Sequence, residues 1–244
     1  MIKQILLFLC FIFLFSCSKK EDKDSVLYVG TSAEYPPYEY LDNNGNIVGF
    51  DIDYINEIAK IMNRKIEIKD MIFDALLPAL ESKKIDLVIA GMVATPQRRK
   101  LVDFSDPYYA GKQAIVVRAD DNSISNFNSL AGKNVAVALG YIADSMVSEM
   151  EGINNIDRLN SSSACILAVK NGKADATVMG HVTALGYAKT NPDIKVIEVD
   201  MDTQELYIAF RKGDYDLVYE VNNAIKTIKE NGTYDRLLNT YFSD

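Results

Sequence analysis

Short apolar segments alternate with amphipathic ones along most of the chain. Runs such as Val26–Gly30, Ile85–Ala90 and Val135–Leu139 are brief, apolar and rich in β-branched residues, which is typical of buried strands. Between such runs, apolar residues recur every three or four positions, as in the segment 52–62, which is the spacing of one helix face. Strands that alternate with helices in this way predict an α/β protein.

This alternation occurs twice, with the second block inserted into the first. A predicted strand at Gln113–Arg118 leads away from the first block, and the apolar run Leu206–Phe210 returns to it. We therefore expect two α/β lobes joined by two crossing strands, with lobe 1 formed by 26–115 and 206–244 and lobe 2 by 116–205. Such a hinge places a ligand cleft between the lobes.

The N-terminal segment has a different character from the rest of the chain. Lys3 precedes an apolar stretch at 5–15 that is short for a membrane span, so residues 1–16 are predicted to be a signal peptide. Ser16-Cys17, with Leu14 before it, resembles a bacterial lipoprotein signal in which Cys17 is acylated. Residues 17–25 would then form a solvated, lipid-anchored tether. An ordinary secretory peptide with an incidental cysteine is the alternative.

Charge and cysteine content exclude several classes of function. The chain of 244 residues has a formal charge of −8, which becomes −9 when Lys3 leaves with the signal peptide, and no basic patch suggests a nucleic-acid partner. Besides Cys17, the mature chain keeps only Cys165, so no internal disulfide is expected, and the apolar helical context of Cys165 predicts a buried, inert thiol. With one histidine and no acidic cluster beside it, no metal site is expected.

The strongest candidate for a binding site follows the strand that ends at Ala90. After Gly91, the pair Thr95-Pro96 is typical of a helix N-cap and first turn, so Arg98 falls in the first turn of a short helix. A helix start offers unpaired N–H groups, and an added guanidinium makes a place for a carboxylate. On residue types alone, a solvated basic face remains the alternative.

The motif at Gly91–Arg98, G-[MIL]-x-x-T-P-x-R, is followed by VDFSDPYY at 102–109. This order resembles the polar amino-acid group of bacterial extracellular solute-binding proteins, family 3. Matching pieces occur at Tyr35–Tyr40, Gly45–Asp53, Phe73–Leu80, Asn171–Ala176 and Asn231–Phe242. The resemblance extends from Val26 to Phe242, and the order and spacing of the pieces make it far more specific than any single piece.

The resemblance implies a periplasmic-binding-protein type II fold and a role in transport rather than catalysis. A member of this group would capture an amino acid or a related small carboxylate by closure of its lobes. It would then deliver this solute to the membrane permease of an ABC importer, acting as a monomer without a cofactor. The location implied is the cell envelope, with the lipid anchor on the outer side of the cytoplasmic membrane or in the periplasm.

The resemblance also implies a set of ligand-binding positions. Tyr35 and Phe73 would be the aromatic walls of the pocket, although a place in the ordinary core is the alternative for both. Arg98 would hold the carboxylate, and the pocket would also include Ala90, Gly91 and Ser32, the last of which brings no fixed charge.

Three positions depart from the family pattern. Val93 stands where the family usually has a polar residue, Tyr141 follows Gly140 where it has threonine, and Gly180 stands where it has the aspartate that binds the ammonium group. The site thus keeps Arg98 to bind a carboxylate but lacks most of the groups that would bind an ammonium group. This predicts a solute other than an ordinary α-amino acid in the ordinary pose.

Some alternatives remain open at this point. His181, beside Gly180, is either a surface or capping residue or a polar group that projects into the cleft. The protein could be an extracellular sensing module that feeds no transporter. It could also be a dehydratase-like enzyme on the same scaffold, although the position for a general acid is occupied by Gly180.

Overall fold

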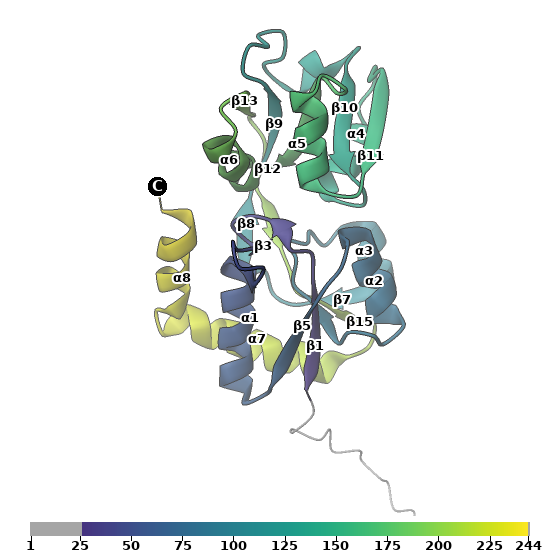
Figure 1. Ribbon diagram of the computed structural model, residues 1–244. Coiled ribbons are helices and arrows are strands. Elements are labelled where there is room, and N and C mark those ends of the chain that lie inside the picture. The colour runs from purple at the N-terminus through teal and green to yellow at the C-terminus, as the bar shows by residue number, and fades with distance from the viewer. Residues whose placement is uncertain (1–25, 244) are drawn as a thin grey trace, which may run out of the picture.

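Two five-stranded sheets form the centres of two lobes that are stacked one above the other (Figure 1). The computed structural model describes residues 26–243. The sheet of lobe 1 has the order β5-β1-β6-β15-β7 and that of lobe 2 the order β11-β10-β12-β9-β13. The lobe 1 strands are β1 Leu27–Thr31, β5 Ile66–Asp70, β6 Leu87–Val88, β7 Val102–Phe104 and β15 Ala209–Arg211. Those of lobe 2 are β9 Gln113–Arg118, β10 Asn134–Ala138, β11 Asn155–Leu159, β12 Ala176–Gly180 and β13 Ile194–Glu198.

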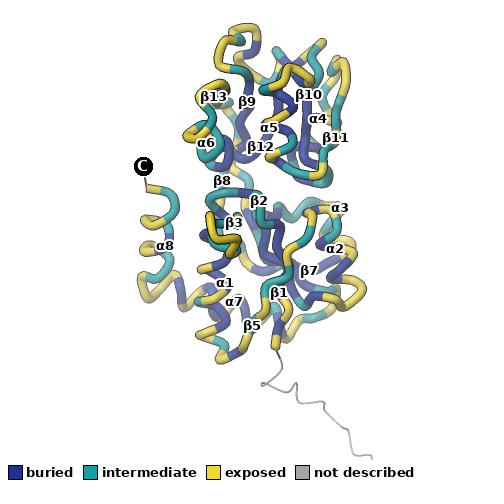
Figure 2. The backbone as a smooth tube through the Cα atoms, in the orientation of Figure 1, coloured by how far each residue is buried: buried dark blue, intermediate teal, exposed yellow. Residues whose placement is uncertain are grey.

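Helices cover both sheets, and the inner strands β1, β6, β10 and β12 are mostly buried, whereas the edge strands β5 and β11 are more exposed (Figure 2). Those of lobe 1 are α1 Phe50–Met62, α2 Phe73–Glu81, α3 Pro96–Leu101, α7 Tyr215–Glu230 and α8 Thr233–Phe242. Lobe 2 has α4 Ile142–Ser148, α5 Ser162–Lys170, α6 His181–Thr190 and a 3₁₀ turn at Phe127–Leu130. One face of α7 is apolar and packs into the core of lobe 1, because Leu217, Val221 and Ile228 are buried. Cys165 is also buried, as predicted, and burial raises the pKa of its thiol to about 12.

Two antiparallel strands, β8 (Tyr109–Gly111) and β14 (Gln204–Leu206), carry the chain between the lobes. Two details differ from the sequence expectation. The run Leu206–Phe210 is not one strand, because the backbone leaves β14 to donate from Tyr207 N to Met92 O and enters β15 only at Ala209. The strand β9 pairs with β12 from Gln113 onward, so residues 113–115 belong to the sheet of lobe 2 rather than to lobe 1.

The parallel strands of each sheet determine where a site can form. In lobe 1, β1 runs parallel to β5 and β6, and in lobe 2, β10 runs parallel to β11 and β12. Ligands of open α/β sheets bind beyond the carboxyl ends of such strands. A small antiparallel sheet of three strands, β2 (Glu34–Tyr35), β3 (Glu39–Leu41) and β4 (Ile47–Val48), follows β1 on this side. The turn between β3 and β4 contains Asp42–Gly45, where Gly45 N donates to Asp42 O.

Two kinds of feature are not found in the part of the chain that the structure describes. None of the helices within residues 26–243 is both long and apolar enough to cross a membrane. In the same residues, no group of three or more His, Cys, Asp or Glu side chains could hold a metal ion. The predicted signal peptide, Cys17 and the tether lie outside the described residues.

Candidate functional site

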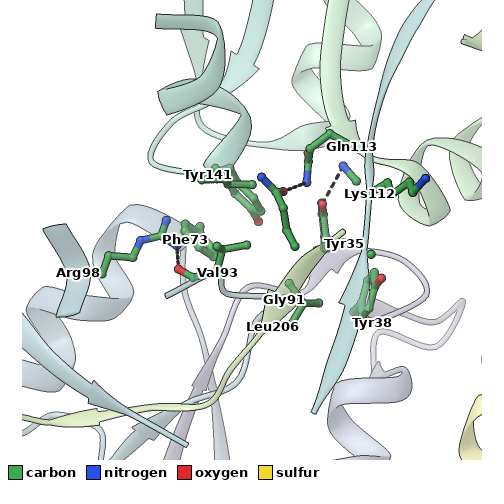
Figure 3. Close-up of a pocket in the computed structure, with 14 residues that line it drawn as sticks. Tyr35, Tyr38, Phe73, Gly91, Val93, Arg98, Lys112, Gln113, Tyr141 and Leu206 are labelled. Carbon is green, nitrogen blue, oxygen red and sulfur yellow. Dashed lines mark hydrogen bonds between the residues drawn. The ribbon is translucent and has the colours of Figure 1, made fainter. Parts of the chain in front are cut away.

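A pocket between the lobes gathers residues that follow the ends of β1, β6, β10 and β12 (Figure 3). Its cavity has a volume of only about 20 Å³. A single water needs roughly 10–15 Å³ by the same measure, and pockets for small molecules are typically hundreds of Å³. The lining residues are Tyr35, Tyr38, Phe73, Gly91, Val93, Arg98, Gly111, Lys112, Gln113, Tyr141, Ile142, Gly180, Gln204 and Leu206.

Arg98 is held at the start of α3 and reaches across the cleft. As predicted, Thr95 is the N-cap of this helix, and its Oγ1 accepts a hydrogen bond from Arg98 N at 3.2 Å. The guanidinium donates from Nη1 to the carbonyl of Val93 at 2.6 Å and from Nη2 to that of Gly140, in lobe 2, at 2.6 Å. It also lies over the ring of Phe73, 5.2 Å from the ring centroid. Burial lowers the pKa of Arg98 to about 10, so the group remains cationic at neutral pH.

The space between the two predicted aromatic walls is filled by a third ring. The centroid of Tyr141 lies 4.0 Å from that of Phe73, in a stacked arrangement, and 5.4 Å from that of Tyr35. Only 6% of Tyr141 is exposed. The ring therefore occupies the place between Tyr35 and Phe73 where the family resemblance would put a ligand side chain.

Glu34, in β2, is a member of the site that sequence reasoning missed. Its Oε1 accepts from the hydroxyl of Tyr141 at 3.0 Å, and its Oε2 accepts from the backbone N–H of Ser162, at the start of α5, at 2.7 Å. Both partners are in lobe 2, so the carboxylate links the lobes. Burial raises the pKa of Glu34 to about 7. No local signal marks this residue, because its partner Ser162 lies 128 positions further along the chain.

Close contacts require glycine at two positions of the site. Gly180 itself departs from the family pattern, and Gly140 precedes Tyr141, which also departs from it. Gly180 donates its N–H to Tyr35 Oη at 2.9 Å, and a Cβ at position 180 would lie 2.4 Å from the same oxygen. Gly140 has a φ of +78°, and its Cβ would lie 2.8 Å from Asp74 Oδ1. In this arrangement an aspartate at position 180 would collide with Tyr35. The packing of the tyrosines in the cleft therefore requires that the ammonium-binding aspartate be absent.

The backbone of Gly91 is held by a hydrogen bond to a buried carboxyl group of lobe 1. Its N–H donates to Asp51 Oδ2 at 3.0 Å, and the hydroxyl of Tyr108 donates to the same atom at 2.7 Å. Burial raises the pKa of Asp51 to about 6, while burial and the nearby charge of Asp51 raise that of Glu39 well above its usual range. The turn after β6 is thereby anchored to the core of lobe 1.

The structure brings most of the predicted site residues together. The lining includes Tyr35, Phe73, Gly91, Val93, Arg98, Tyr141 and Gly180, and Gly140 contributes its carbonyl. Ser32 and Ala90 are buried but lie outside the lining. His181 faces a separate groove between α6 and α8, with its Nε2 3.5 Å from Glu198 Oε1. Sequence reasoning also missed Gln113 and Gln204, whose side chains bond to each other at 3.0 Å across the pocket.

Two α/β lobes joined by two strands, with a partly buried cation in the cleft at the strand ends, define the class of bilobal solute-binding proteins. Within that class, the family of bacterial extracellular solute-binding proteins, family 3, matches residues 27–244, and the chain belongs to this family. The sequence-based expectations of family and fold class are thus confirmed.

Individual relatives agree with this assignment. The arginine-binding extracellular protein ArtP of Bacillus subtilis (strain 168) is 38% identical over 234 residues, which cover 93% of this chain and 90% of that protein. The structure of an ancestral arginine-binding protein bound to arginine is 40% identical with a TM-score of 0.88, covering 91% of this chain and all of that one. The ancestral amino acid-binding protein AncCDT-1, a precursor of cyclohexadienyl dehydratase, is 38% identical with a TM-score of 0.84, covering 89% and 96% of the two chains.

Proposed function

We propose that this protein binds an amino acid or a related small carboxylate between its lobes and delivers it to the permease of an ABC importer. The observation that carries the proposal is Arg98, a partly buried guanidinium in the cleft that donates to two backbone carbonyls, lies over the ring of Phe73 and feels the charge of Asp74. A charge removed from water is costly without a directly bonded counter-charge. A guanidinium fork matches a carboxylate with two parallel hydrogen bonds, so a carboxylate solute would supply that counter-charge.

The named relatives support an amino acid as the solute. One is named as arginine-binding and another is a structure with arginine bound. Arginine and other amino acids with long polar side chains are therefore the first solutes to test. The departures at Val93, Tyr141 and Gly180 support a binding pose in which the ammonium group is not held as the family resemblance implies.

The family is one of extracellular proteins, which supports a location in the cell envelope. We propose that Cys17 carries a lipid anchor and that the mature monomer works at the outer side of the cytoplasmic membrane or in the periplasm. Labelled palmitate should enter the wild-type protein but not Cys17→Ala. Co-purification with a permease distinguishes delivery to a transporter from a purely sensing role.

The ligand test compares solutes that differ in one group. Isothermal titration of the mature protein with L-arginine is expected to show binding, whereas agmatine, which lacks only the carboxylate, is expected to bind at least about 100-fold more weakly. Loss of two charge-assisted hydrogen bonds accounts for such a difference. Equal binding of the two solutes would contradict a carboxylate site at Arg98.

A dehydratase is the second candidate, supported by the likeness to AncCDT-1. Dehydration needs a general acid with a pKa near the working pH, and Glu34 is a carboxyl group at the cleft whose pKa is about 7. Turnover of a prephenate-like substrate, lost in Glu34→Gln, would establish this activity. Its absence leaves solute binding as the function.

A further inference from the structure

The side chain of Tyr141 occupies the binding slot in the manner of a bound solute. Its ring is stacked on Phe73 at 4.0 Å and touches the ring of Tyr35, while its hydroxyl donates to Glu34 at 3.0 Å. The remaining cavity of about 20 Å³ is too small for any amino acid. A solute can therefore enter the slot only if this ring leaves it.

The groups that lie at the two ends of Tyr141 can each bind a charged group of a solute. At the backbone end, Arg98 donates to the carbonyl of Gly140, the residue before Tyr141. At the far end, the Glu34 carboxylate accepts from the phenol hydroxyl, and the described residues provide no ion-pair partner for Glu34. A guanidinium and a carboxyl group thus stand at opposite ends of the slot, each hydrogen-bonded to neutral groups, and the charge of Asp74 also acts on Arg98.

We propose that Tyr141 is an internal occupant of the binding slot, which a solute displaces by placing its carboxylate on Arg98 and a cationic N–H donor group on Glu34. This assigns Tyr141 and Glu34 as residues that determine specificity, and the solute class as amino acids whose long side chains end in a cation. The inference rests on the proposed function, since it concerns the same cleft.

The exchange is favourable at each of the three contacts. At Arg98, a carboxylate replaces a neutral carbonyl as acceptor, and charge-assisted hydrogen bonds are roughly twice as strong as neutral ones. At Glu34, a cation replaces the phenol hydroxyl and favours the ionised form of this partly buried carboxyl group. Between them, Phe73 and Tyr35 offer ring faces to a flat cationic group in place of the ring of Tyr141. Solutes without the terminal cation form the contact with Arg98 but not the charged contact with Glu34. We therefore expect them to displace the ring of Tyr141 less readily.

The test removes the occupant and measures affinity by isothermal titration. In Tyr141→Ala, L-arginine should bind at least about tenfold more tightly than in the wild type, because no ring has to be displaced. Tyr141→Phe keeps the ring but loses the bond to Glu34, so an intermediate gain is expected. Tyr187→Phe is the matched control: it removes a hydroxyl that donates to the backbone carbonyl of Glu34 rather than to its carboxylate, and affinity should not change.

The second arm tests the charge at Glu34. In the Tyr141→Ala background, L-arginine should bind at least about tenfold more tightly than L-citrulline, which has the same shape without the charge. Adding Glu34→Gln should abolish this preference. Circular-dichroism melts of every variant verify that the lobes remain folded.

The outcomes separate the two proposals. Wild-type binding that Tyr141→Ala weakens would make Tyr141 a wall of the site and overturn this inference alone. A preference for arginine that survives Glu34→Gln would overturn the role of Glu34. If neither the wild type nor folded Tyr141→Ala binds any amino acid, the proposed function fails and this inference fails with it.

Discussion

Both lobes present the same local motif to the cleft, a strand followed by a turn that contains a glycine and then by a helix, but the two corners carry different chemistry. In lobe 1, Gly91 is followed by α3, which is capped by the side chain of Thr95 and carries Arg98. In lobe 2, Gly140 is followed by α4, whose N-cap Tyr141 makes no side-chain capping bond. The corner of lobe 1 supplies charge, and that of lobe 2 supplies a carbonyl and a ring.

This difference shows how binding is divided between the lobes. Arg98 and Glu34, the charged groups that the two proposals assign to the solute, both belong to lobe 1, while lobe 2 offers them neutral partners: the carbonyl of Gly140, the hydroxyl of Tyr141 and the N–H of Ser162. Lobe 1 is therefore expected to select the solute by charge. Lobe 2 is expected to close over it and to control access through Tyr141.

The largest effect is expected from breaking the charged corner of lobe 1. Arg98→Ala should weaken binding of a carboxylate solute by about 100–1,000-fold, because two charge-assisted hydrogen bonds are lost. Arg98→Lys keeps the charge without the fork and should lose less. Isothermal titration measures both. Equal losses in the two variants would show that geometry rather than charge selects the solute.

The charge at Glu34 predicts a pH dependence of stability. Its pKa is about 7 in the folded protein and about 4.5 when unperturbed, so the folded state binds the proton more tightly. The resulting stabilisation is complete below about pH 4.5 and is lost as the pH rises to about 7, at most about 3 kcal/mol. Glu34→Gln should flatten this decline in urea unfolding measured between pH 4.5 and 8.

A residual slope should remain in Glu34→Gln, because burial also raises the pKa of Asp51, to about 6, which acts in the same direction. An unchanged decline in the variant would contradict the raised pKa of Glu34.

The contact between Gly180 and Tyr35 predicts a smaller loss. Gly180→Ala should lower the free energy of unfolding by about 1–3 kcal/mol, since its Cβ would lie 2.4 Å from Tyr35 Oη. Adding Tyr35→Phe removes that oxygen and should recover part of the loss. Gly186→Ala, in helix α6, which begins directly after Gly180, is the control: its Cβ meets atoms only at 3.7 Å or more, so no loss is expected. Thermal and urea unfolding would measure these differences, and additive effects of the first two changes would refute the clash.

The smallest effect concerns the helix cap of the lobe 1 corner. Thr95→Ala should cost about 1 kcal/mol of stability, because Arg98 N loses its acceptor. Thr95→Ser retains the hydroxyl and should cost much less. If the cap also orients Arg98, the alanine variant should bind L-arginine several-fold more weakly while the serine variant does not.

The sequence by itself determined the elements and the corner of lobe 1. Apolar periodicity and capping residues act over a few positions, so they predict the strand before Gly91, the cap at Thr95 and the helix face in 52–62 without knowledge of the fold. Arg98 was predictable for the same reason, because its place depends on the helix start next to it. The order of the motifs along the chain then indicated two lobes and the family.

Only the tertiary structure decided what fills the cleft. At position 141 the sequence indicates only the loss of a threonine, but the ring of Tyr141 is stacked on Phe73 and its hydroxyl reaches Glu34, 107 positions away. At position 180 the sequence indicates only the loss of a ligand, but Gly180 is required by a tyrosine from the other lobe. Such contacts depend on which side chains two separately folded sheets bring face to face, and no local pattern of polar and apolar residues encodes that pairing.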